Sequence, residues 1–204
     1  MAAQSSRLIF AWLGIFLLVL AWSAWQPRDY VTWWLEVLPA LLALVILAAT
    51  RNRFPLTPLA YWLILAHCIV LMAGGHFPYA EVPLGDWLME VSGGQRNNYD
   101  KLGHFMQGFV PAIVAREILI RNHVLARRGW LSLFVVSICL AFSAFYELVE
   151  WWVALLSSEA AESFLGTQGY VWDTQSDMFL ALAGAVIALF TLGRIHDRQL
   201  LELD

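Results

Sequence analysis

Six apolar stretches follow one another along the chain, separated by polar segments. They cover residues 8–25, 33–50, 56–74, 102–120, 130–152 and 177–192. Each is close to the about 20 residues that an α-helix needs to cross a bilayer. Because no repeat or low-complexity stretch separates them, the pattern predicts an all-α polytopic membrane protein. We expect a single domain over residues 1–204, built as a six-transmembrane-helix bundle.

Two of the polar segments are longer than the others, and both fall on the same side of this arrangement. The first, residues 75–99, places apolar side chains at helical spacing at Leu84, Trp87, Leu88 and Val91. This spacing predicts a short helix that lies in the headgroup region. The second, residues 154–172, carries Glu159 and Glu162 before a glycine-containing turn. We expect it to cap the outer mouth of the bundle.

Nine of the twelve Lys and Arg residues lie on the opposite side from these two segments. They are Arg7, Arg51, Arg53, Arg116, Arg121, Arg127, Arg128, Arg194 and Arg198. Cytoplasmic segments carry the excess of basic residues, so both termini are predicted to be cytoplasmic. Only Arg28, Arg96 and Lys101 face outward. A cleavable signal in the first apolar stretch is an open alternative, and it would leave the other orientations unchanged.

The composition excludes a soluble domain, because 60% of the residues are hydrophobic and only 14% are charged. Membrane lipids are therefore expected neighbours of the chain. No basic stripe suggests a nucleic-acid partner, and the net charge of -4 says little about protein partners. Cys68 and Cys139 lie inside apolar stretches, where a thiol packs as a small hydrophobic group, so no disulfide framework is expected.

Ionisable residues recur in pairs at the outer ends of the last three apolar stretches. Asp100 and His104 are four residues apart, which places them on one helical face. The other two pairs have similar spacing, and they are Glu147 with Glu150 and Asp173 with Asp177. Charged groups in a membrane are costly and usually face one another, water or an ion. The three pairs therefore predict one outward-facing acidic and histidine pocket.

Repulsion between these carboxylates predicts a bound divalent cation, because Lys101 alone supplies too little positive charge. Oxygen-rich ligands with one imidazole favour Mg²⁺ or Mn²⁺, or Zn²⁺ if fewer groups coordinate. The candidate metal ligands are His104, Glu150, Asp173 and Asp177. The candidate catalytic residues are His104, Glu147 and Asp100. Further pocket candidates are Lys101, Gln107, His76 and Glu81, whereas His67 is interpreted as a packing residue. Taken singly, each of these residues is more often an interfacial side chain, a helix cap or an interhelical hydrogen-bond partner than a ligand.

The strings YDKLGHFMQGFVPAIVAREIL, YELVEWW and LGTQGYVWDTQSDMFLALAGA resemble the YjdF-type family of uncharacterised bacterial inner-membrane proteins. The resemblance covers about residues 75–188 and implies a multi-pass protein of the bacterial inner membrane, with no established activity. The Asp-Lys-x-x-His-Phe start and the paired aspartates before the last stretch are more loosely similar to VanZ-type proteins. Asp100, Lys101, His104, Phe105, Asp173 and Asp177 carry that weaker likeness.

Three classes of function are compatible with such a pocket. A metal-dependent enzyme acting on a lipid or lipid-linked substrate would use the cation to polarise an oxygen atom, with a carboxylate or His104 as general base. An ion- or proton-coupled transporter would need ionisable groups along a path through the bilayer. A non-enzymatic scaffold or sensor would need only a stable pocket. The clustering of acids at one depth favours the first class.

Overall fold

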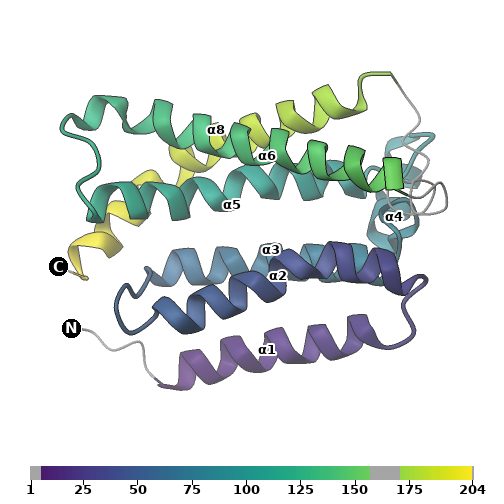
Figure 1. Cartoon of the computed structure of the whole chain (residues 1–204), viewed down its shortest axis with the longest axis horizontal. Coiled ribbons are helices and arrows are strands. Elements are labelled where there is room, and N and C mark those ends of the chain that lie inside the picture. The colour runs from purple at the N-terminus through teal and green to yellow at the C-terminus, as the bar shows by residue number, and fades with distance from the viewer. Residues whose placement is uncertain (1–5, 157–170, 204) are drawn as a thin grey trace.

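All regular elements in the described part of the chain, residues 6–156 and 171–203 of this computed structural model, are helical. The α-helices are α1 (Ser6–Ala24), α2 (Tyr30–Thr50), α3 (Pro58–His76), α4 (Pro83–Ser92), α5 (Tyr99–Arg121), α6 (Leu131–Leu156) and α8 (Asp173–Leu201). Two 3-10 turns, η1 (Tyr79–Glu81) and η2 (Arg128–Trp130), join them. The long helices run side by side, and α4 lies at one end of the bundle (Figure 1). The expected all-α fold is confirmed.

Each predicted apolar stretch forms a helix, and within the described residues four helical segments are long and apolar enough to cross a membrane. These are α2, α3, α8 and the segment Arg128–Val153, which contains most of α6. Helix α8 is longer than the predicted span 177–192, because it continues through polar turns at both ends that a hydropathy pattern does not detect. Helix α5 carries charged residues toward both ends, and two of them, Lys101 and Glu117, pair with Asp177 and His196 of α8.

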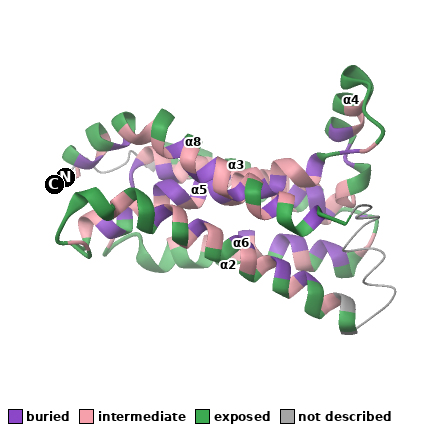
Figure 2. Cartoon of the chain, turned by 90° about the horizontal axis from the view of Figure 1, so that it is seen from above, coloured by how far each residue is buried: buried purple, intermediate pink, exposed green. Residues whose placement is uncertain are grey.

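The predicted short helix within residues 75–99 is confirmed as α4. Its apolar side chains, Leu84, Trp87, Leu88 and Val91, are exposed on the described structure, as a helix in contact with lipid headgroups requires. Figure 2 shows α4 projecting from the end of the bundle. The helix ends at Gly93, whose φ of 67° favours glycine. Most of the second long segment, residues 157–170 with Glu159 and Glu162, lies outside the described residues.

Helix α5 lies against α3, α6 and α8, and its contact with α8 is the most extensive in the bundle. The two helices approach each other closely at two glycines. A Cβ atom on Gly108 would lie 1.8 Å from the carbonyl oxygen of Ala181, and one on Gly184 would lie 2.2 Å from that of Phe105. Gly103 instead faces the ring of Tyr79. This close approach fixes how α5 and α8 are rotated toward each other.

Gly108→Ala is therefore expected to lower the free energy of unfolding by about 1–3 kcal/mol, because the new methyl group forces the backbones of α5 and α8 apart. Gly193→Ala is the matched control on α8, since nothing lies within 4 Å of its Cβ position. It should be neutral or slightly stabilising, as alanine is the better helix former. Thermal unfolding in mild detergent measures both. Equal melting temperatures for the two variants would contradict the close approach.

The bundle consists of two packed groups of helices. Phe16, Val37 and Met72 belong to an apolar cluster formed by α1, α2 and α3. Ile113 and Val135 belong to a second cluster formed mainly by α3, α5, α6 and α8. Helix α3 thus connects the two groups, and buried residues concentrate where the helices face one another (Figure 2). The candidate site is formed by α5, α6 and α8 of the second group, at the end of the bundle where α4 is found, and the cavity beside it extends to α2 and α3.

Candidate functional site: a buried acidic and histidine cluster

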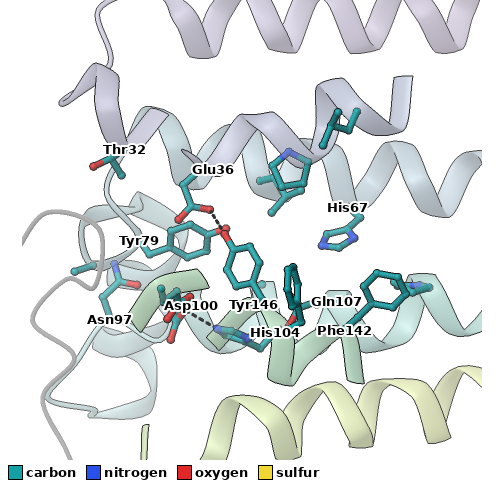
Figure 3. Close-up of a pocket in the computed structure, with 18 of the residues that line it drawn as sticks. Thr32, Glu36, His67, Tyr79, Asn97, Asp100, His104, Gln107, Phe142 and Tyr146 are labelled. Carbon is teal, nitrogen blue, oxygen red and sulfur yellow. Dashed lines mark hydrogen bonds and ion pairs between the residues drawn. The ribbon is translucent and has the colours of Figure 1, made fainter. Parts of the chain in front are cut away.

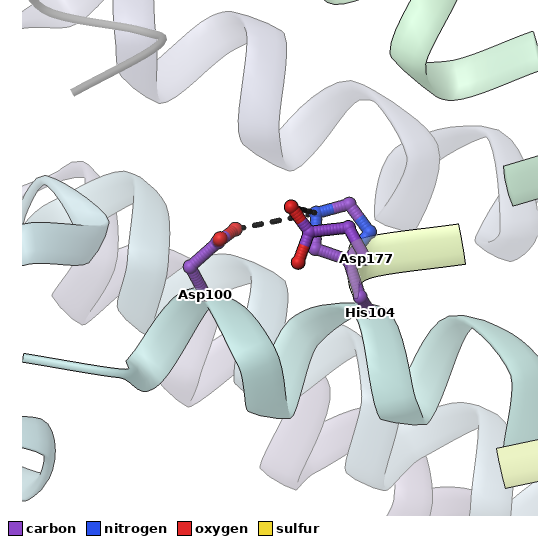
Figure 4. Close-up of side chains that lie close together, drawn as sticks. All are labelled: Asp100, His104 and Asp177. Atoms are coloured by element: carbon purple, nitrogen blue, oxygen red, sulfur yellow. Dashed lines mark ion pairs between the residues drawn. The ribbon is translucent and has the colours of Figure 1, made fainter. Parts of the chain in front are cut away.

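His104 of α5 is the centre of a cluster of carboxylates from three helices. Its Nε2 lies 3.2 Å from Asp100 Oδ1 and 3.9 Å from Asp177 Oδ2. Its Nδ1 lies 3.8 Å from Glu147 Oε1 and 3.2 Å from Gln107 Oε1. Figure 4 shows Asp100, His104 and Asp177 converging. The helical spacing in α5 places Asp100, His104 and Gln107 on one face, and the contact with α8 supplies Asp177.

Two basic side chains hold the aspartates of α8. Lys101 Nζ lies 2.6 Å from Asp173 Oδ1 and 2.6 Å from Asp177 Oδ1. Arg96 Nη2 lies 3.3 Å from Asp173 Oδ2. Both oxygens of Asp173 therefore face cations, and this residue holds Lys101 and Arg96 in place beside the cluster. The sequence had assigned Asp173 as a metal ligand and had not included Arg96.

Three carboxylate oxygens in the cluster are buried and have no hydrogen-bond partner among the residues that the structure describes. They are Asp100 Oδ2, Glu147 Oε1 and Asp177 Oδ2. Buried anionic oxygens are costly when they accept no hydrogen bond, so they mark a place where a cation or another polar group would be stabilised. In the part of the chain that the structure describes, two sets of side chains offer ligand atoms within 4.8 Å of one another. One set is Asp100, His104 and Asp177, and the other is His104, Glu147 and Glu150.

A cavity of about 370 Å³ adjoins this cluster, between the α2–α3 pair and the α5–α6 pair. Glu36, Tyr79, Asn97 and Asp100 lie toward one end of it, and His67 and Phe142 lie toward the other (Figure 3). His104, Gln107 and Glu150 also line it. The cavity therefore connects the charged cluster to a more apolar region deeper in the bundle.

Glu36 of α2 belongs to this site, although the sequence analysis did not select it. The residue is buried, and Tyr146 Oη lies 3.5 Å from its Oε2. Tyr79 also lines the cavity beside this carboxylate. Burial, followed by the negative charge of Glu36, raises the pKa of Tyr79 well above its usual value, so this hydroxyl is a donor. A single acid within an otherwise apolar helix was a signal that pointed to Glu36.

The structure places the pocket candidates His76 and Glu81 away from the cavity and places His67 beside it. His76 Nδ1 lies 3.1 Å from the carbonyl oxygen of Ser23, and its ring packs on Trp22. Glu81 forms an exposed ion pair with Arg28. Neither lines the cavity, so the structure does not bring them to the cluster. His67, interpreted as a packing residue, does line the cavity.

A second buried cluster lies at the other end of α5, around Glu117, whose side chain is fully buried. Thr57 donates to Glu117 from its backbone N–H, at 3.0 Å, and from its hydroxyl, at 2.8 Å. Arg121 Nη1 lies 2.8 Å from Oε1, and His196 Nε2 lies 3.1 Å from Oε2. Both oxygens have partners, so the cluster holds the start of α3 to α5 and α8. The sequence had assigned Arg121 no such role, although Glu117 and Arg121 have ion-pair spacing.

Comparison with known proteins gives one family and one curated relative. The family described as "Predicted membrane protein (DUF2238)" matches residues 8–198. The inner membrane protein YjdF of Escherichia coli (strain K12) is 51% identical over 183 residues, which is 90% of this chain and 88% of the relative. No solved structure matches the chain. The weaker likeness to VanZ-type proteins stays a prediction.

Proposed function

The chain belongs to the DUF2238 family of predicted membrane proteins, and from this premise we propose that its buried cluster binds a divalent cation. The proposed activity is that of a metal-dependent enzyme on a lipid or lipid-linked substrate. The observation that carries the proposal is the set of three buried carboxylate oxygens around His104 that have no hydrogen-bond partner within residues 6–156 and 171–203. A cation would offset both their mutual repulsion and their lost hydration.

His104 is the proposed ligand common to both sets, together with either Asp100 and Asp177 or Glu147 and Glu150. Most of these ligands are carboxylates, which favours Mg²⁺ or Mn²⁺, and Zn²⁺ if only one set coordinates. Such a cation polarises a phosphoryl or carbonyl oxygen. Asp100 or Glu147, whichever is left outside the ligand set, is then the proposed general base. Lys101 and Arg96 hold Asp173 and the start of α8 beside this centre.

Six spans with both termini in the cytoplasm are part of the proposal. The basic residues favour this orientation, and α1 begins and α8 ends at the end of the bundle opposite α4 (Figure 1). The cluster would then lie at the depth of the outer leaflet, where a lipid headgroup is found.

Reporter fusions test this topology. A fusion at the C-terminus is expected to report the cytoplasm, and one inserted at Gly94, after α4, the periplasm. An alkaline phosphatase and fluorescent protein pair reads both compartments. A periplasmic C-terminus, or one compartment for both sites, would contradict the proposed arrangement.

An ion- or proton-coupled transporter is the second candidate. One observation favours it: the Glu117 and His196 cluster places ionisable groups at the opposite end of α5, and His67 lines the cavity. The two buried clusters thus lie toward opposite faces of the proposed membrane domain. Proteoliposomes with a trapped pH dye distinguish the candidates. Proton flux that is lost in both the His104→Ala and His196→Ala variants would favour the transporter over the enzyme.

A further inference from the structure

The apolar part of the cavity is open to the surroundings of the bundle between α2 and α6. Leu42, Phe142 and Phe145 line the cavity, yet their exposed fractions are 52%, 60% and 56%. Helix α2 packs mainly on α3, whereas α6 packs on α5 and α8. The facing sides of α2 and α6 therefore leave an opening, and in a membrane this opening faces lipid.

The lining of the cavity changes from charged to apolar along the bundle axis. On α2, Leu42 follows Glu36 by six residues, or about 9 Å at the usual helical rise. On α6, Phe142 precedes Glu150 by eight residues, or about 12 Å. Pro39, Leu71 and Pro111 line the region between. The charged end lies toward α4, and the apolar end lies toward the middle of the helices (Figures 1 and 3).

A lipid oriented as in a bilayer changes from polar to apolar in the same direction as the lining of this cavity. Its headgroup lies at the membrane surface and its hydrocarbon chain points to the middle. A small polar ligand would gain nothing from a wall of Phe142, Phe145 and Leu42. The cavity volume of about 370 Å³ is within the range of about 300–1,000 Å³ that ligand pockets occupy.

We infer that a membrane lipid enters sideways between α2 and α6, with its hydrocarbon chain against Leu42 and Phe142 and its headgroup beside His104. The inference rests on the proposed function, because the cation of the cluster would contact the phosphate of that headgroup. It assigns the substrate to membrane amphiphiles that have a phosphate headgroup, and the bilayer as their source. A substrate from the periplasm would not need this opening.

Photo-crosslinking in vesicles tests the route. The probe is a phosphatidylethanolamine with a diazirine in one acyl chain, and the labelled peptides are identified by mass spectrometry. We expect labels on Leu71 and Pro111, which line the cavity, as well as on lipid-facing residues such as Phe190. Leu42→Trp and Phe142→Trp should narrow the opening and lower the internal labelling several-fold. Val45→Trp is the control, because Val45 is exposed on α2 but does not line the cavity.

Two further measurements distinguish a failure of the lipid route from a failure of the proposed cation site. Leu42→Ala and Phe142→Ala should raise the internal labelling, which guards against tryptophan variants that fail to fold. Bound metal is measured on every variant by elemental analysis. Internal labelling that is absent, or equal in all variants, overturns the lipid route even if metal is bound. Internal labelling that falls in the tryptophan variants and rises in the alanine variants supports the route. If the same protein binds no metal, the lipid route stands and the proposed cation is wrong.

Discussion

Removing divalent cations is expected to lower the melting temperature of the purified protein by about 5–10 °C, and adding Mg²⁺ or Mn²⁺ back should restore it. A ligand present at about one hundred times its Kd stabilises the folded state by about 2.7 kcal/mol. For a chain of this length, each kcal/mol corresponds to about 2–4 °C. The effect should be large here because the cation separates carboxylates that otherwise face one another in a buried site.

His104→Ala should abolish this response, because both candidate ligand sets contain His104. His123→Ala is the control, since His123 is exposed at the opposite end of the bundle. His67 is unsuitable as a control because it lines the cavity. If chelation leaves the melting temperature unchanged and no stoichiometric metal co-purifies, the cation proposal is wrong. Protonation and hydrogen bonds would then hold the acids, and the scaffold or sensor interpretation would gain support.

Glu117→Ala is expected to lower the free energy of unfolding by about 3–5 kcal/mol, the cost of removing one partner from a buried ion pair. The substitution leaves Arg121, His196 and the hydroxyl and backbone N–H of Thr57 without their shared acceptor. It also leaves a void where α3, α5 and α8 meet. Glu117→Gln should lower the free energy of unfolding less than Glu117→Ala does, because the amide keeps the side-chain volume and one acceptor oxygen. Thermal unfolding in detergent measures both variants.

Asp197→Ala provides the matched comparison at the same end of the bundle. Asp197 pairs with Arg116 at 2.7 Å, but its side chain is half exposed. Exposed ion pairs contribute about 0–1 kcal/mol, so this substitution should have little effect. Similar destabilisation by Glu117→Ala and Asp197→Ala would show that burial of the Glu117 cluster does not matter for stability. The cluster would then no longer account for how α3, α5 and α8 are held together.

Local patterns in the sequence determined the helices and much of the site. Hydropathy over about 20 residues located each long helix, and a 3.6-residue period identified α4. The four-residue spacing placed Asp100 and His104 on one face of α5. Gly108 and Gly184 are small residues of the kind that permit close helix contacts, and α5 and α8 approach each other at both. These features depend only on residues within a few positions of one another, and for that reason a single sequence contains them.

The tertiary structure alone decided which of these faces meet. It brought Glu36 to the cavity from α2, turned Asp173 toward Lys101 and Arg96, and placed His76 against Ser23. It also joined Glu117 to His196, which is 79 residues away. How each helix rotates and which neighbours it selects depend on side-chain packing between distant segments, such as the contact of Gly108 with Ala181. Hydropathy and spacing describe one helix at a time, so they contain no information on that choice.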